Sequence, residues 1–267
     1  GGSSVRNDSI ILTFANRKKV KMKLLVCISK APDTTSKIAF ANGNTSFDEA
    51  GVTFIVNPYD EWYALVRALE LKEAQGGSVT VISVGGSDYE QIIRKALAIG
   101  ADDAVRIDAP ETDALIVAKH IADYAKDQAF DLILTGKETI NYNGSIVPGM
   151  LAEMLSLPYV TLASKLNVTG NVATCEREIA GGVEVLEVTL PAVISAAKGM
   201  AEQRIPNMKG IMSARTKPLQ VITPAGVEAN TSVQNFEMPP AKGACKFIAP
   251  ENAAELIQLL HTEAKVI

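Results

Sequence analysis

The stretch that decides the fold is SVTVISVGGSDYEQIIRKALAIGADDAVRI, which runs from Ser78 to Ile107. Its first residues are β-branched and apolar, which is typical of a strand buried on both faces of a parallel sheet. The Gly85–Gly86 pair ends that strand, and apolar residues at helical spacing then predict a helix that stops at Gly100. Ser87, followed three residues later by Glu90, predicts a capping box at the start of this helix. A second apolar strand completes the stretch, which therefore has the pattern of a strand–helix–strand unit of a parallel sheet.

The same alternation extends to both sides of this unit. Lys23–Ile28 is an earlier apolar strand, and Thr112–Lys126 has the spacing of an amphipathic helix. Asp131–Thr135 predicts another buried strand, and the helix after it carries Met150 and Leu151. Strands that alternate with helices predict an open, mostly parallel, Rossmann-like α/β sheet with right-handed crossovers.

The second half of the chain has a different sequence pattern. From Tyr159 on, short β-rich segments separated by glycine turns predict antiparallel additions to the sheet. The last part has little core of its own and predicts an extended arm that ends in a helix from about Pro250 to Lys265. Such a short helix is marginal in water when isolated, so a partner subunit is expected to bind it. The expected division is a tag or upstream extension over residues 1–21, an α/β nucleotide-binding domain over 22–219 and the arm over 220–267.

Composition argues against several classes of function. The 267 residues carry a net charge of −4, which disfavours a nucleic-acid partner because phosphates require a basic face. No run of about 18 apolar residues occurs, so no membrane insertion is expected. The three cysteines are odd in number and far apart, which argues against a disulfide framework and favours a cytoplasmic location.

The motifs of common enzymes are missing from the sequence. It has no HExxH, G-x-S-x-G or GxxxxGK[ST] pattern, and no G-x-G-x-x-G after a strand. The two histidines, His120 and His261, lie in separate predicted helices. No catalytic or metal-binding residue is therefore predicted. If the protein takes part in a reaction, a bound cofactor is expected to carry the chemistry.

Polar or small residues follow several predicted strands, at the edge where the carboxyl ends of parallel strands meet. They form loops at residues 27–30, 57–60, 84–88 and 136–147. Ligands of doubly wound sheets bind at this edge, and a loop that opens a helix offers backbone N–H groups to a phosphate. Every α/β sheet has such loops, so these residues by themselves leave open whether a nucleotide site exists.

Seven segments in a fixed order carry a resemblance to a known family. Over nearly all of residues 22–267 the chain resembles the β subunit of electron transfer flavoproteins. The segments are Leu24–Ile28 with Pro32–Thr34, Asn57–Asp60, Ala96–Asp102, Gly136–Ile140, Glu176–Gly182, Leu190–Val193 and Ile205–Lys209. The resemblance implies a sheet of the adenine-nucleotide α-hydrolase type.

The same resemblance implies a function in electron transport. It implies a heterodimer in which FAD lies mainly on an α subunit and accepts electrons from flavin dehydrogenases, such as the acyl-CoA dehydrogenases of fatty acid β-oxidation. The electrons then pass to a quinone reductase or another acceptor. In such proteins the β subunit holds a structural AMP, or a second FAD in bifurcating members, and performs no bond chemistry of its own.

Site residues follow from the resemblance by matching position. Tyr59 stands where the family places an aromatic residue close to the flavin of the α subunit. The segment from residue 196 to 207 matches the family's loop that docks on dehydrogenases, with Met200, Arg204, Ile205 and Pro206 as its contacts. The residues implied to bind a cofactor are Cys27, Asn57, Pro58, Tyr59, Asp60, Val84, Gly136, Lys137, Asn141, Tyr142, Asn143, Gly144, Ser145, Ile146 and Val147.

The sequence departs from the family pattern in the implied nucleotide loop. Asn141 and Asn143 stand where the family often has Asp. Gly144, Ser145, Ile146 and Val147 occupy further positions at which the family usually has polar residues that contact the nucleotide. Ser29 replaces a Lys that is common after the first strand. The pattern of the bifurcating subgroup is absent, which argues against a second FAD. Because backbone N–H groups can hold a phosphate, the sequence leaves open whether AMP binds.

Two other functions compete with this interpretation. A stand-alone nucleotide-binding regulator of the universal-stress type shares the architecture but does not need the long carboxyl-terminal arm. An adenylating ATP pyrophosphatase is faintly suggested by Gly85–Asp88, although that segment follows a middle strand and lacks the flanking serines of the pyrophosphate loop.

Overall fold

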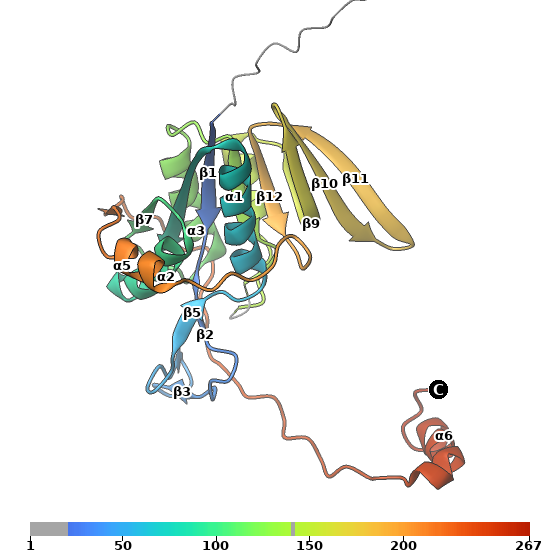
Figure 1. Ribbon diagram of the computed structural model, residues 1–267. Coiled ribbons are helices and arrows are strands. Elements are labelled where there is room, and N and C mark those ends of the chain that lie inside the picture. Colours follow the sequence, from blue (N-terminus) through green and yellow to red (C-terminus); the bar gives the residue numbers. More distant parts are fainter. Residues whose placement is uncertain (1–20, 140–141) are drawn as a thin grey trace, which may run out of the picture. The chain divides into compact units, whose positions relative to one another are not determined.

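The fold is built on one large sheet with helices on both faces. The computed structural model describes residues 21–139 and 142–267 (Figure 1). They divide into two compact units, one of residues 21–39 and 48–233 and the other of residues 40–47 and 234–267. The predicted extension over residues 1–21 lies outside the described residues, apart from Lys21.

In the described chain the large sheet has nine strands in the order β11-β10-β9-β12-β8-β1-β6-β7-β13. Every neighbouring pair from β9 to β13 in this order is parallel, whereas β10 is antiparallel to both β9 and β11. The predicted open, mostly parallel sheet with antiparallel additions is thereby confirmed. The strands are β1 (Met22–Cys27), β6 (Gly77–Val84), β7 (Asp103–Ile107), β8 (Leu132–Gly136), β9 (Tyr159–Thr169), β10 (Val172–Ile179), β11 (Gly182–Thr189), β12 (Ala192–Ala196) and β13 (Leu219–Ile222).

Alternating side chains of the central strands pack into two separate cores. On β1, Leu24 and Val26 join the core that also contains α1 (Asp60–Gln75) and α2 (Glu90–Ile99). Leu25 and Cys27, which point to the opposite face, join the core under α3 (Ala114–Ala125) and α4 (Val147–Leu155). The continuous apolar run of this strand thus reflects burial on both faces of the sheet.

Short elements complete both units. In the first unit, β2 (Lys30–Pro32) pairs with β5 (Phe54–Val56), and the helix α5 (Met208–Ala214) precedes β13. The second unit contains the small hairpin of β3 (Phe40–Ala41) and β4 (Ser46–Phe47), together with residues 234–267 of the arm. There the ring of Phe40 stacks on that of Phe236, with 5.1 Å between centroids. The arm ends in a short 3₁₀ turn, η2 (Pro250–Asn252), and the helix α6 (Ala253–Thr262).

The structure differs from the sequence predictions at three element ends. The predicted capping box is wrong, because Ser87 begins a 3₁₀ turn, η1 (Ser87–Tyr89), whose cap residue makes no side-chain bond, and Glu90 is the first residue of α2. The boundary expected at residue 220 falls inside β13, which pairs with β7 and carries the sheet to Ile222. The final helix is shorter than predicted, since α6 ends at Thr262.

Among the residues that the structure describes, no helix is long and apolar enough to cross a bilayer.

Candidate functional site

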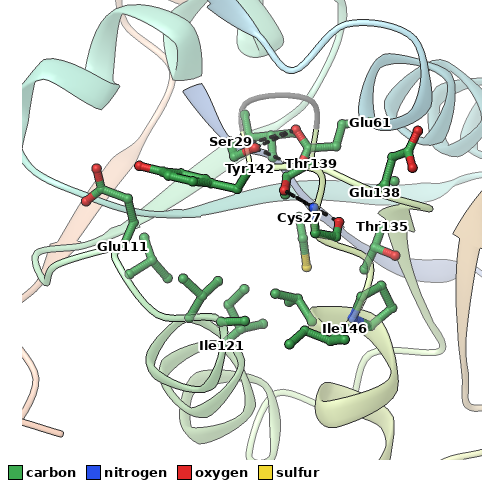
Figure 2. A pocket seen from close by; sticks show the side chains of 18 of the residues that line it. Cys27, Ser29, Glu61, Glu111, Ile121, Thr135, Glu138, Thr139, Tyr142 and Ile146 are labelled. Atoms are coloured by element: carbon green, nitrogen blue, oxygen red, sulfur yellow. Dashed lines mark hydrogen bonds between the residues drawn. The ribbon is translucent and has the colours of Figure 1, made fainter. Parts of the chain in front are cut away.

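A cavity of about 220 Å³ lies at the carboxyl ends of β1, β6 and β8, beside α3 and the start of α4 (Figure 2). This is the edge at which doubly wound sheets bind their ligands. Most of its wall is apolar, and this part is formed by Ile28, Val84, Ala114, Val117, Ile121, Ile146, Val147 and Pro148. The polar part of its lining includes Ser29, Glu61, Glu111, Thr112, Thr135, Glu138, Thr139 and Tyr142.

A buried carboxyl group, Glu61, lies at one side of this cavity. Glu61 is in the first turn of α1 and is 7% exposed. The backbone N–H and the hydroxyl of Ser29 both donate hydrogen bonds to it. Burial raises the pKa of Glu61 to about 8, and the bonds from Ser29 oppose this shift without cancelling it. Burial, reinforced by Glu61, also raises the pKa of the Cys27 thiol.

The loop that follows β8 is closed on itself. The backbone N–H of Thr139 donates to the carbonyl of Gly144 at 2.6 Å, and the N–H of Gly144 donates to the Thr139 hydroxyl at 3.1 Å. Before this closure, Lys137 donates to the carboxylate of Glu138 at 2.7 Å. The loop therefore uses backbone donors and its nearby cation for contacts within the chain.

One hydroxyl of the lining has no partner. Thr135, at the end of β8, is 4% exposed, and its Oγ1 makes no hydrogen bond within the part of the chain that the structure describes. A buried hydroxyl without a partner costs free energy, so it favours a ligand or water that can bond to it.

The residues that the resemblance implied for a cofactor fall into three groups. One group lines the cavity and comprises Cys27, Val84, Gly136, Tyr142, Gly144, Ile146 and Val147. A second group is described by the structure but does not line it, and comprises Asn57, Pro58, Tyr59, Asp60, Lys137, Asn143 and Ser145. Asn141 lies outside the described residues.

Asn57 and Asp60 do not line the cavity, and both are buried. Asn57 is fully buried and its side-chain N–H donates to the carbonyl of Glu138 at 3.4 Å, which ties the start of α1 to the loop after β8. Asp60 is 5% exposed, and burial raises its pKa to about 6, an effect that Lys137 opposes. These contacts indicate that the two side chains hold the site together.

Several lining residues were missed by the sequence analysis, chiefly Glu61, Glu111, Thr112 and Thr135. Glu61 directly follows the predicted segment 57–60, so a helical projection of α1 would have placed it beside the strand ends. Glu111 and Thr112 precede α3, and their position beside the cavity depends on how that helix packs. No local pattern signals such a packing arrangement.

Tyr59 has a strained backbone. Its φ of 64° and ψ of −95° lie outside the usual range for a bulky residue, and its side chain is 57% exposed. Such strain costs roughly 1–3 kcal/mol and is found preferentially at functional sites. The residue precedes α1, so its ring is presented to the outside at a fixed position.

The segment predicted to dock on dehydrogenases is only partly exposed. Ile205 is 85% exposed, whereas Met200 is 5% exposed and belongs to the core. The side chain of Met200 already packs within this chain, so Ile205 is the apolar side chain of this segment that is exposed to a partner. Arg204 donates two hydrogen bonds to Glu73 on α1, at 2.7 and 3.2 Å, and Pro206 is half-buried beside it.

The open parallel sheet, the helices on both faces and the cavity at its carboxyl edge define a doubly wound α/β protein of the Rossmann-like class. The sequence matches the family described as "Electron transfer flavoprotein domain" over residues 44–226. The chain belongs to the electron transfer flavoprotein family, as a β subunit: an electron carrier subunit and not itself an enzyme.

Individual relatives agree with this assignment. The chain is 39% identical to the electron transfer flavoprotein subunit beta of Bacillus subtilis (strain 168), over 92% of this chain and 100% of the relative. It is 38% identical to that of Syntrophomonas wolfei, over 84% and 89% of the two chains, and 30% identical to that of Dictyostelium discoideum, over 90% and 98%. The family predicted from the sequence is confirmed.

Proposed function

We propose that this chain pairs with an electron transfer flavoprotein α subunit and that the heterodimer carries electrons through FAD bound mainly to that subunit. Flavin dehydrogenases, such as the acyl-CoA dehydrogenases of β-oxidation, supply the electrons. A quinone reductase or another acceptor receives them. The family and the names of the relatives support the pairing, since each is a β subunit by name.

The observation that carries the pairing is the arm that ends in α6. This helix has only ten residues and none of them is buried, although Leu256 and Ile257 are apolar. Phe247, earlier in the arm, is 91% exposed. A helix of this length is marginal in water by itself, and exposed apolar side chains favour burial against another surface. The α subunit is the proposed source of that surface.

Tyr59 is the residue of this chain that we assign to the flavin. An aromatic ring that is exposed and held by a strained backbone fits a contact with a planar cofactor on another chain. When bound, FAD supplies the redox chemistry, and Tyr59 would contribute a fixed apolar wall beside it.

AMP does not fit the cavity of this chain. The described lining contains the carboxyl groups of Glu111 and Glu138 but no Lys, Arg or His. Glu61 also lines it, but burial raises the pKa of Glu61 to about 8, so this group is mostly protonated near pH 7. A phosphate monoester needs cationic or N–H partners, and carboxylates repel it. No role for AMP is therefore included in the proposed function.

A cytoplasmic location is part of the proposal. Cys27, Cys175 and Cys245 are free thiols, and Cys245 is exposed. An exposed free thiol is compatible with a reducing compartment.

The pairing can be tested by producing the full chain with and without a candidate α subunit. Size-exclusion chromatography with light scattering should show a one-to-one complex with bound FAD. A variant that lacks residues 250–267 should retain the folded α/β unit, as judged by circular dichroism, but bind the α subunit much more weakly. If the full chain is a stable monomer and does not bind the α subunit, the proposal is contradicted.

A further inference from the structure

We infer that the cavity at the carboxyl ends of β1, β6 and β8 binds an uncharged, mainly apolar small molecule and discriminates against phosphate-bearing ligands such as AMP. This inference concerns the cavity alone and does not depend on the proposed electron transfer.

The first argument is the charge of the lining. Three residues with carboxyl groups, Glu61, Glu111 and Glu138, line the cavity, and Figure 2 shows Glu111 across the cavity from Glu61 and Glu138. Burial keeps Glu61 mostly protonated near pH 7, so the negative charge of the lining comes from Glu111 and Glu138. No cationic side chain is present among the lining residues that the structure describes. Beyond the effect of burial, Glu111 raises the pKa of the Tyr89 and Tyr142 hydroxyls, as expected for a carboxylate beside the cavity, and Lys30 opposes this shift at Tyr142.

The second argument is the shortage of donors for an anion. The cations Lys137 and Lys30 lie near the lining without belonging to it. Lys137 is paired with Glu138 at 2.7 Å, and Lys30, whose Nζ lies 5.3 Å from the ring centroid of Tyr89, is paired with Asp88. The backbone N–H of Thr139 donates to the carbonyl of Gly144, and the N–H of Gly144 donates to the hydroxyl of Thr139, so both donors are already used within the loop. At the start of α4, Pro148 removes one of the backbone N–H groups that a helix N-terminus otherwise offers, and the cap residue Ile146 adds no polar side chain.

The third argument is the apolar character of the rest of the lining. The walls are formed largely by the aliphatic side chains of Val84, Val117, Ile121, Ile146 and Val147. Apolar walls with a few placed polar groups are typical of small-molecule sites, and here none of the described lining residues is cationic. The unpartnered hydroxyl of Thr135 and the buried carboxyl group of Glu61 can each make one directed hydrogen bond to such a molecule.

Adenosine and AMP provide a matched pair of probes, because they differ only in the phosphate. Isothermal titration of the full chain should show adenosine binding about tenfold more tightly than AMP, the size expected for one like-charge contact at modest screening. Raising the salt concentration should narrow this ratio, since salt screens repulsion. AMP that binds as tightly as adenosine, AMP recovered in a one-to-one amount from the purified protein, or a failure of both probes to bind would each overturn the inference.

A variant tests the electrostatic cause. Glu138→Gln removes one carboxylate and releases Lys137, so the affinity for AMP relative to adenosine should rise severalfold. Glu153→Gln, a change of the same chemistry at an exposed position of α4 outside the cavity, should leave the ratio unchanged. An unchanged ratio in Glu138→Gln would contradict the inference, whether or not the chain pairs with an α subunit.

Discussion

The hydroxyl of Ser29 lies 2.9 Å from each carboxylate oxygen of Glu61, and the backbone N–H of Ser29 lies 2.9 Å from one of them. This contact joins the end of β1 to the first turn of α1. It holds a buried carboxyl group beside the cavity through neutral donors. The stability and the proton affinity of this part of the protein therefore depend on a single short residue.

Glu61 should make the stability of the protein depend on pH. Its pKa is raised from the ordinary 4.5 to about 8 in the folded chain, chiefly by burial. Between these values the folded state keeps the proton while the unfolded state loses it. The stabilising contribution of protonated Glu61 to the free energy of unfolding is fully present below about pH 4.5. It is lost as the pH rises to about 8, and the free energy of unfolding falls by at most about 1.4 kcal/mol per pH unit. Urea unfolding from pH 5 to pH 9 should show this decline, and Glu61→Gln should remove it. A difference between the two proteins that is constant with pH would contradict the assignment.

Ser29→Ala should destabilise the protein and raise the pKa of Glu61 further. The substitution removes the hydroxyl bond and leaves only the backbone N–H as donor. A lost bond to a buried polar group costs about 1–3 kcal/mol, which denaturant unfolding at pH 7 would measure. Ser87→Ala, at an exposed position, serves as the control and should change the free energy of unfolding by less than about 0.5 kcal/mol.

Gly136→Ala should be strongly destabilising. A Cβ at Gly136 would lie 2.7 Å from Cγ of Glu61 and 2.9 Å from its backbone nitrogen, so α1 would have to move away from β8. The expected loss is about 2 kcal/mol or more, visible as a lower thermal midpoint. Gly149→Ala is the matched control. Its Cβ would make only an ordinary contact with Tyr159 at 3.6 Å, and alanine within α4 should stabilise by up to about 1 kcal/mol.

Tyr59→Gly should stabilise the isolated chain but impair its complex with an α subunit. Glycine adopts the positive φ of 64° without strain, which should add about 1 kcal/mol to the free energy of unfolding. Loss of the aromatic ring should alter the absorption spectrum of FAD in the complex. Ser156→Gly relieves a similar positive φ of 53° at the end of α4 and should leave that spectrum unchanged. If the FAD absorption spectra of the Tyr59→Gly and Ser156→Gly complexes were the same, Tyr59 would not be part of the flavin site.

Ile205→Ala should slow reduction of the complex by a dehydrogenase. The side chain is 85% exposed, and an exposed aliphatic anchor can carry much of the affinity of a small interface. Stopped-flow measurement of flavin reduction should show a rate about fivefold lower at limiting dehydrogenase, with unchanged FAD content and complex mass. Ile38→Ala, at another exposed isoleucine, is the control. Equal rates for Ile205→Ala and the unmodified protein would exclude Ile205 from the interface.

Periodicity predicted the sheet well because burial on both faces leaves a clear sequence pattern. Leu24 and Leu25 pack on opposite sides of β1, and a strand covered by helices on both faces requires both to be apolar. Local rules were less successful at element ends. Ser87 and Glu90 have the spacing of a capping box, but a 3₁₀ turn shifts the start of the helix.

The lining of the cavity was only partly predictable. Cys27 and Val84 follow from the strand ends, since every parallel strand delivers its carboxyl end to the same edge. Glu111 and Thr135 reach the cavity through the packing of α3 and the register of β8, which are set by contacts distant in sequence. The burial of Met200 was missed for the same reason, because a loop residue next to glycine carries no local sign of its depth.

The carboxyl-terminal arm has a consequence for the cell. A polypeptide released from the ribosome with Phe247, Leu256 and Ile257 uncovered resembles a misfolded protein to chaperones and proteases. Surplus copies should be degraded, and those that meet their counterpart should survive. Degradation of unpaired copies would then keep the amounts of the two subunits equal, with the arm as the degradation signal.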